Sequence, residues 1–248
     1  MISDKRDEFK SLAETYDWTE QTIEDIDFWL SYTSPGNKKI LEIGTGTGRV
    51  AMHLIKHCQK YVALDISVSM LEKAKQKIGE KPNIEYLIGD IRNLRFPNQF
   101  DLIIAPGRVF EHFYSDEDRN LALQNCYSHL IPDGQLILHV FGPPQDNKET
   151  KEFEKIIPST TEHDQLKFSY KEVRDFTCNH RYHYFEISEL GGRKRKWKHE
   201  PLKLRWFTPE ELDNLSKNIG FITTGRFNSL KKEYIKDGSI NLIWELTK

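Results

Sequence analysis

The stretch Ile40–Val50, which reads ILEIGTGTGRV, decides the fold that we expect for this chain. Its first four residues are largely apolar and run directly into a turn that contains Gly44, Gly46 and Gly48. Glycine is needed where a turn is tight or where the main chain must come close to a ligand, because a Cβ atom would collide there. We therefore interpret the stretch as a buried strand, a cofactor-binding turn and the start of a helix.

The region from residue 39 to residue 141 continues this pattern, because short apolar runs alternate with helical segments. Such alternation is typical of βαβ units around a parallel sheet. The expected strands are 39–44, 61–66, 84–88, 100–105 and 135–141, followed near the end of the chain by 221–227 and 240–247. The sequence therefore predicts an α/β fold with a Rossmann-like, doubly wound, mostly parallel seven-stranded sheet.

Three helix starts can be predicted from capping residues. Ser67 is expected to cap the helix after the second strand, and Asp116 the helix over 121–130, because a side-chain oxygen can accept from a free N–H of the first turn. The stretch 208–211, Thr-Pro-Glu-Glu, combines a capping box with proline at the first helical position. Gly220 is expected to end that last helix.

The chain divides into three predicted parts. Residues 1–38 have apolar residues at helical spacing and are expected to form a helical cover. Residues 39–145 and 208–248 form the Rossmann-like core. Residues 146–207 change to alternating apolar residues with a Gly191-Gly192 turn, which predicts an antiparallel β insertion.

Composition narrows the class of protein. The length of 248 residues suits one large domain or a domain with an insertion, and the net charge of −2 provides no general attraction for polyanions. Cys58, Cys126 and Cys178 are widely spaced and odd in number, so we expect neither disulfides nor a metal site. No apolar run approaches the ~18 residues of a membrane span, and the first residues lack a secretory signal. A cytoplasmic protein is expected, with a homodimer left open.

Two acidic residues follow the neighbouring strands. Asp65 lies 21 residues after Gly44, since 65 − 44 = 21, close to the roughly 20-residue interval at which a carboxylate meets ribose hydroxyls. Asp90, followed by Ile91, ends the third strand, where it could bind an exocyclic amine. The glycine spacing is G-x-G-x-G rather than the G-x-G-x-x-G of dinucleotide sites, and no phosphate loop is present. These features predict an adenosine-shaped site.

The ordered motifs LEIGTGTG, LDIS, GDI, FDLII and LIPDGQL closely resemble class I S-adenosylmethionine-dependent methyltransferases over residues 39–141 and the terminal helix and strands. Tyr16-Asp17 and the insertion before RWFTPEEL, residues 205–212, are similar to the small-molecule branch that includes glycine N-methyltransferase and amino-sugar N,N-dimethyltransferases. The resemblance implies S-adenosyl-L-methionine as the cofactor and a small molecule as the methyl acceptor. It also implies that the insertion over residues 146–207 covers the substrate.

The resemblance also implies a set of cofactor-binding residues. The turn would hold the methionyl part through Gly44, Thr45, Gly46, Thr47 and Gly48, and Ala105 would face it. Glu42 would support the turn indirectly, and Tyr16 would form an aromatic wall beside the sulfonium. The adenosine part would contact the ends of the second and third strands and the following helix, which are Asp65, Ile66, Met70, Asp90 and Ile91.

The candidates for catalysis follow the fourth strand. Methyl transfer from a sulfonium is an in-line displacement, so the protein mainly aligns the reactants, excludes water and keeps the acceptor deprotonated. If a base is used, His112 is the first candidate, because an imidazole with an ordinary pKa near 6.5 accepts a proton at neutral pH, and Glu111 is the second. Phe110 and Phe113 could line the sulfonium by cation–π attraction.

Three alternatives remain beside a small-molecule methyltransferase that acts on nitrogen or oxygen. The segment 191–205 has seven Lys and Arg residues against one Glu, a balance of 7 − 1 = +6, so an RNA or protein methyltransferase could use it. Such a run is more typical of a charged strand edge that prevents aggregation, and no nucleic-acid-binding motif accompanies it. A non-catalytic S-adenosylmethionine-binding protein and an NAD-dependent dehydrogenase are the other two.

Overall fold

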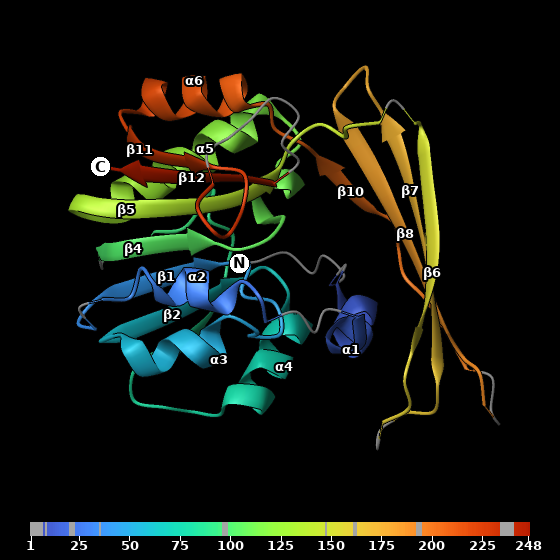
Figure 1. Cartoon of the computed structure of the whole chain (residues 1–248). Coiled ribbons are helices and arrows are strands. Elements are labelled where there is room, and N and C mark those ends of the chain that lie inside the picture. Colours follow the sequence, from blue (N-terminus) through green and yellow to red (C-terminus); the bar gives the residue numbers. More distant parts are fainter. Residues whose placement is uncertain are drawn as a thin grey trace.

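A sheet with helices on both faces and a second, separate sheet make up the molecule (Figure 1). The computed structural model describes residues 7, 9–19, 23–34, 36–95, 99–146, 148–160, 163–191, 195–233 and 241–248. None of the described helices is both long enough and apolar enough to span a membrane.

The first sheet has seven strands in the order β11-β12-β5-β4-β1-β2-β3. The strands are β1 (Lys39–Ile43), β2 (Lys60–Asp65), β3 (Ile84–Ile88), β4 (Phe100–Ala105), β5 (Leu130–Phe141), β11 (Ile222–Phe227) and β12 (Asn241–Thr247). Strands β1 to β5 are mutually parallel, and β12 pairs antiparallel with β5 and β11. The predicted fold is therefore confirmed, and β1 stands at the point where strand order reverses.

Alternate side chains of the buried strands point to opposite faces. Leu41 and Ile103 contribute to the apolar cluster shared with α5 (Asp116–His129) and α6 (Pro209–Ile219). Ile40 and Ile104 contribute to the opposite cluster. On that face lie α2 (Ile26–Leu30), α3 (Ala51–Leu54) and the 3-10 turn η1 (Ile55–His57). The remaining core helix, α4 (Val68–Ile78), follows β2. Burial on both faces explains why these strands are almost continuously apolar.

Two of the three predicted helix caps are confirmed. The Ser67 hydroxyl accepts from Met70 N at 3.2 Å, and the Thr208 hydroxyl accepts from Glu211 N at 3.1 Å. Gly220 ends α6 in the left-handed conformation, with φ of 109°. The prediction for Asp116 is wrong, because the preceding residue, Ser115, caps α5 by accepting from Asp118 N at 3.1 Å.

The second sheet is antiparallel and is built from the inserted segment. Its strands are β6 (Thr150–Ile157), β7 (Leu166–Asp175), β8 (His180–Glu189), β9 (Lys196–Lys198) and β10 (Leu202–Arg205). Its apolar cluster includes Leu166, Phe168 and Ile187, and Trp18 of α1 (Lys10–Thr19) packs against it. Helix α1 consequently lies between the two sheets (Figure 1). Gly192, in the predicted Gly-Gly turn, lies outside the described residues.

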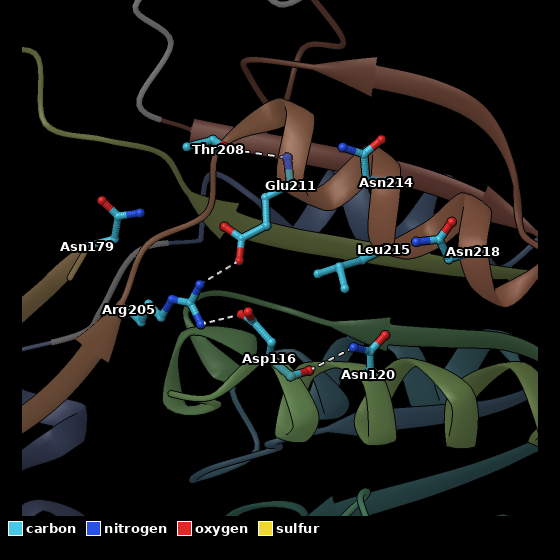
Figure 2. A pocket seen from close by; sticks show the side chains of 9 residues that line it. All are labelled: Asp116, Asn120, Asn179, Arg205, Thr208, Glu211, Asn214, Leu215 and Asn218. Atoms are coloured by element: carbon cyan, nitrogen blue, oxygen red, sulfur yellow. Dashed lines mark hydrogen bonds and ion pairs between the residues drawn. The ribbon is translucent and has the colours of Figure 1, made fainter. Parts of the chain in front are cut away.

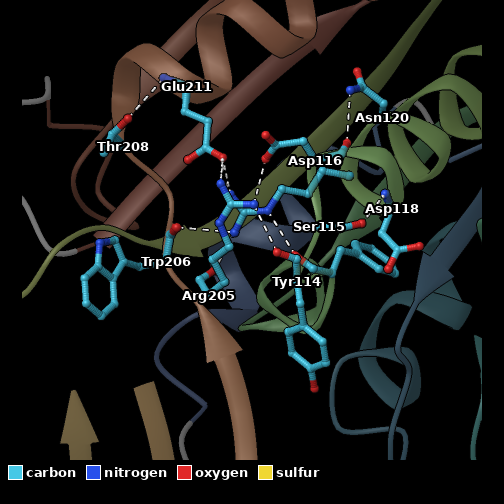
Figure 3. A network of polar contacts seen from close by, with 11 residues as sticks. Tyr114, Ser115, Asp116, Asp118, Asn120, Arg205, Trp206, Thr208 and Glu211 are labelled. Atoms are coloured by element: carbon cyan, nitrogen blue, oxygen red, sulfur yellow. Dashed lines mark hydrogen bonds and ion pairs between the residues drawn. The ribbon is translucent and has the colours of Figure 1, made fainter. Parts of the chain in front are cut away.

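Arginine side chains attach the end of the second sheet to the core. Arg119 of α5 is fully buried and donates to Phe113 O at 3.0 Å, to Arg205 O at 2.6 Å and to Glu211. Arg205 in turn pairs with Asp116 at 2.7 Å and with Glu211 at 3.0 Å (Figure 3). Glu211, in the first turn of α6, therefore uses its carboxylate to join β10 to α5.

Candidate functional site

The glycine turn lies at the carboxyl end of β1, and all three of its glycines have left-handed backbone, with φ of 66°, 56° and 82°. A Cβ atom on Gly44 would lie 2.4 Å from Val109 Cγ2, and one on Gly48 would lie 2.8 Å from Ile78 Cδ1. Gly46 differs, because a Cβ atom there would meet nothing within 4 Å. Packing therefore requires the two outer glycines, and the main chain at Gly46 borders open space.

Asp65, at the end of β2, is hydrogen-bonded to this turn. Its Oδ2 atom accepts from Gly46 N at 2.7 Å, and its Oδ1 atom accepts from Ser67 N at 2.9 Å. Burial raises the pKa of the Asp65 carboxyl, and the hydrogen bonds from main-chain N–H groups act against that rise. Each carboxylate oxygen retains a lone pair that can accept a hydroxyl. The predicted neighbourhood of Asp65 and the turn is present.

Glu42 lies beneath the turn, with only 2% of its surface exposed. It accepts hydrogen bonds from the Thr45 hydroxyl and, at 2.8 Å, from the Tyr61 hydroxyl. Burial raises the pKa of Glu42 to about 7 in spite of these bonds. These contacts suit the supporting role that the sequence predicts for Glu42.

Replacing Glu42 by glutamine should change how the stability of the protein depends on pH. The ordinary pKa of 4.5 rises to about 7 on folding, so between these values the folded chain holds a proton that the unfolded chain has lost. The Glu42 carboxyl therefore contributes less stability as pH rises. Urea unfolding should show the wild-type free energy of unfolding, relative to Glu42→Gln, falling by roughly 2 to 3 kcal/mol from pH 5 to pH 8. A pH-independent difference would contradict this titration.

The N-terminal segment is hydrogen-bonded to the same region. Asp7 accepts from the Ser67 hydroxyl and from Ser69 N, both at 2.8 Å. Asp17 of α1 accepts from the Thr47 hydroxyl at 2.6 Å. The segment that the sequence predicts as a cover therefore contacts both the glycine turn and the start of α4.

The other predicted cofactor contacts are distributed around this corner. Ile66 follows Asp65 and is 57% exposed, which leaves an apolar surface beside the carboxylate. The remaining apolar residues of the set are buried or half-buried, and they are Tyr16, Met70, Ile91 and Ala105. Asp90 is engaged elsewhere, because Arg92 binds its carboxylate through Nε at 3.1 Å and Nη2 at 2.5 Å. An amine would have to share Asp90 with Arg92.

The two predicted bases lie on the 3-10 turn η2 (Val109–His112), and they differ in environment. Glu111 is fully buried, accepts from Phe141 N at 2.9 Å and pairs with Arg181 of β8 at 2.8 Å. Its carboxylate thus joins the core to the second sheet, an arrangement that disfavours proton abstraction. His112 is half-buried and contacts the ring of Phe9 edge-on, with 5.6 Å between centroids.

The surroundings of His112 keep its imidazole neutral. Burial, together with the neighbouring His183 and the positive charge of Arg108, lowers the pKa of His112 to about 4. No hydrogen bond to its ring is found among the described residues. A neutral imidazole nitrogen can accept a proton or a hydrogen bond from a bound molecule.

A polar cluster between the sheets was not predicted from the sequence. Arg108 Nη1 lies 3.1 Å from His183 Nδ1, and His183 Nε2 lies 2.9 Å from Glu172 Oε2. Because a guanidinium only donates, Nδ1 is the acceptor and Nε2 carries the proton of a neutral ring. Glu172 also accepts from Tyr170 and Arg174. The signal in the sequence was Glu172 and Arg174, two residues apart on the buried face of β7.

A separate pocket of about 460 Å³ lies between α5 and α6 (Figure 2). Its lining is rich in amide and charged side chains, namely Asp116, Asn120, Asn179, Arg205, Thr208, Glu211, Asn214, Leu215 and Asn218. None of the residues predicted to bind cofactor lines it. Within the described ranges, no group of three or more His, Cys, Asp or Glu residues could hold a metal ion.

Comparison with known proteins gives a consistent result. Residues 40–134 match the family model described as a methyltransferase domain. A malonyl-[acyl-carrier protein] O-methyltransferase of Ilyobacter polytropus is 31% identical over 171 residues, which cover 67% of this chain and 60% of that protein. A glycine/sarcosine N-methyltransferase of Aphanothece halophytica is 33% identical over 129 residues, which cover 50% of this chain and 49% of that protein. The matches thus span about half to three fifths of these relatives.

The fold has a solved counterpart over almost its full length. An amino pentose methyltransferase from Micromonospora echinaspora, solved with bound S-adenosylmethionine, superposes with a TM-score of 0.77 and 16% identity. The match covers 96% of this chain and 97% of that one, so it includes both sheets.

Proposed function

We propose that this chain is an enzyme that transfers a methyl group from S-adenosylmethionine to a nitrogen or oxygen atom of a small molecule, because residues 40–134 match the methyltransferase domain family and the relatives are N- and O-methyltransferases. The observation that carries the proposal is the open space at Gly46 beside the buried carboxylate of Asp65. A main chain without a facing side chain, next to an acid, fits a ligand that has a polar end and a ribose.

The residues at this corner would divide the cofactor between them. The main chain at Gly46 would meet the methionyl part, Asp65 would accept from the ribose hydroxyls, and exposed Ile66 would pack against the adenine. S-adenosylmethionine supplies an activated methyl group when bound, so this chain need not provide a covalent nucleophile. The remaining tasks are to align the acceptor and to keep water away.

The acceptor would lie between the core and the second sheet. Neutral His112 is available there to accept a proton or a hydrogen bond from the attacking group. Burial next to the positive charge of Arg108 also favours the uncharged form of an amine, which is its nucleophilic form. We retain the three-part division, in which residues 1–38 and 146–207 cover a core of 39–145 and 208–248.

Replacing Asp65 by asparagine should weaken cofactor binding. Asparagine retains the shape of aspartate and a carbonyl oxygen that can accept from Gly46 N, but it loses the charge that strengthens hydrogen bonds from ribose. We expect S-adenosylhomocysteine to bind about tenfold more weakly in isothermal titration calorimetry. The matched control is Asp27→Asn, an exposed aspartate of α2, which should leave the affinity unchanged. Equal affinities for wild type and Asp65→Asn would remove Asp65 from the site.

The same titration tests the proposed function. Failure of the wild-type chain to take up S-adenosylhomocysteine would contradict it, and preferential uptake of NAD would favour a dehydrogenase. Uptake without methyl transfer to any amine, hydroxyl or carboxyl acceptor would favour a non-catalytic binding protein.

We retain the cytoplasm as the proposed location, since all three cysteines are free. We also retain the homodimer as an open question, which size-exclusion chromatography can answer.

An RNA or protein acceptor is less well supported. Two of the basic residues in 191–205 form ion pairs within the chain. Lys196 pairs with Glu186 at 3.4 Å, and Arg205 pairs with Asp116 and Glu211 where β10 meets α5 and α6. Arg193 and Lys194 lie outside the described residues. These pairs reduce the positive field that a polyanion would need. Salt-sensitive RNA binding by the purified protein would reverse this preference.

A further inference from the structure

Arg108 differs from the other buried or half-buried arginines in its partners. Arg181 pairs with Glu111 at 2.8 Å, and Arg174 pairs with Glu172 at 2.5 Å. Among the described residues, no carboxylate lies within ion-pair distance of the Arg108 guanidinium. Its one hydrogen bond found in the described part of the chain goes to neutral His183.

The carboxylates of this cluster are already bound by other donors. Glu111 accepts from Arg181 and from a main-chain N–H, and Glu172 accepts from Arg174, His183 and Tyr170. Asp146 pairs with Arg174, and its side chain is 48% exposed. The guanidinium of Arg108 therefore retains donors and a positive charge that the cluster does not neutralise by direct contact.

A second donor belongs to an arginine that contacts the same aromatic ring as Arg108. The guanidiniums of Arg108 and Arg181 lie 4.6 and 5.8 Å from the ring centroid of the same residue, Phe141. Arg181 is only 4% exposed, and its Nε atom is buried without a hydrogen-bond partner among the described residues. An unsatisfied buried donor costs stability unless a ligand or water completes it.

The position of Arg108 connects this cluster to the glycine turn. Arg108 comes three residues after the end of β4, and the adjacent Val109 packs directly against Gly44. On its other side Arg108 reaches His183 of the second sheet. A molecule bound by Arg108 would therefore lie between the β insertion and the segment that packs on the glycine turn.

We infer that Arg108, assisted by Arg181 Nε, binds an anionic group of the methyl acceptor, either a carboxylate or a phosphate. That the anion belongs to the methyl acceptor rests on the proposed function, whereas the anion site itself rests on the side chains alone. A guanidinium edge matches the planar, bidentate geometry of both anions. The substrate class is therefore a small anionic molecule with a nucleophilic nitrogen or oxygen.

The test uses acetate and inorganic phosphate as probes of the full-length chain, with ¹³C and ³¹P NMR line broadening as the readout. Titrations are run with and without saturating S-adenosylhomocysteine. We expect one of the two anions to bind the wild type, and the one that binds identifies the chemical class. Arg108→Gln should weaken that binding about tenfold or more, because a charge-assisted contact is lost. Arg108→Lys, which keeps the charge, should retain part of the affinity.

The matched control is Arg226→Gln on β11, since this arginine is 51% exposed and should not affect anion binding. Absence of anion binding to the wild type, or equal binding by Arg108→Gln, would overturn the inference. Failure to take up S-adenosylhomocysteine would instead contradict the proposed function. The titrations without S-adenosylhomocysteine would still measure anion binding at Arg108. A methylation screen would compare amino acids with their amides, and phosphorylated amines with the free amines. Faster turnover of the members that lack the anionic group would also overturn the inference.

Discussion

Replacement of Arg119 by methionine is expected to cause the largest loss of stability, about 3 to 5 kcal/mol in the free energy of unfolding. Arg119 is fully buried, and its guanidinium lies 3.5 Å from the centroid of the Phe207 ring. Methionine preserves much of this apolar packing. It removes, however, the donors to the carbonyls of Phe113 and Arg205 and one of the two arginine partners of Glu211. Buried acceptors left without donors carry the full desolvation cost.

Urea unfolding of wild type and variant at one pH measures this effect. Arg226→Met is the control, because the Arg226–Asp213 pair at 2.9 Å is largely exposed on the arginine side and should contribute less than about 1 kcal/mol. If Arg119→Met were no more destabilising than Arg226→Met, Arg119 would not be the residue that joins the second sheet to the core.

Replacement of His112 by alanine is expected to reduce kcat roughly a hundredfold, within the range for loss of a positioned proton acceptor. Affinity for S-adenosylhomocysteine should change little, since no described contact links His112 to Asp65 or Gly46. His57→Ala is a suitable control, because that histidine is exposed on η1. Unchanged kcat in His112→Ala would remove His112 from the mechanism.

The pH profile gives a second readout for His112. An imidazole with a pKa of about 4 is deprotonated at neutral pH and gains a proton only as pH falls. The wild-type kcat should therefore hold steady around neutrality and fall below about pH 5, whereas the residual rate of His112→Ala should lack that step. An anion paired with Arg108 would cancel part of the charge that depresses this pKa. Anionic acceptors should thus move the fall in rate to higher pH than neutral ones.

The core was predictable from the sequence because local signals agree with tertiary packing there. Strands buried on both faces read as apolar runs, and Gly44, Gly46 and Asp65 mark the strand ends at conventional spacing. The prediction failed where local signals conflict. The strand predicted to begin at residue 135 begins at Leu130 in the structure, as β5. Pro132 and Gly134 are typical of a turn, so the sequence pattern placed the start of the strand after them. Ser115 and Asp116 both have the side chain of a cap, and the sequence alone does not rank them.

The second sheet and its contacts with the core could not be predicted for a different reason. Strand β6 is almost wholly exposed, so it has no apolar periodicity to reveal it. The contacts of Arg108 with His183 and of Glu111 with Arg181 join residues 75 and 70 positions apart in the chain. Their partners depend on how the second sheet packs against η2, and neither spacing nor composition records that. The partner of Asp90 is local, since Arg92, two residues later, donates to its carboxylate, but the spacing of two residues does not by itself predict an ion pair.

The ion pair between Glu111 and Arg181 has a consequence for how such a chain can diversify. Gly46, Asp65 and Glu42 all belong to the first sheet or its turns, whereas Glu172 and His183 belong to the inserted sheet. A foreign insertion could therefore be grafted onto the core without disturbing methyl donor uptake. The graft would require that Arg108 and Glu111 be exchanged together with the insertion. Otherwise the buried carboxylate of Glu111 would lose its ion pair with Arg181.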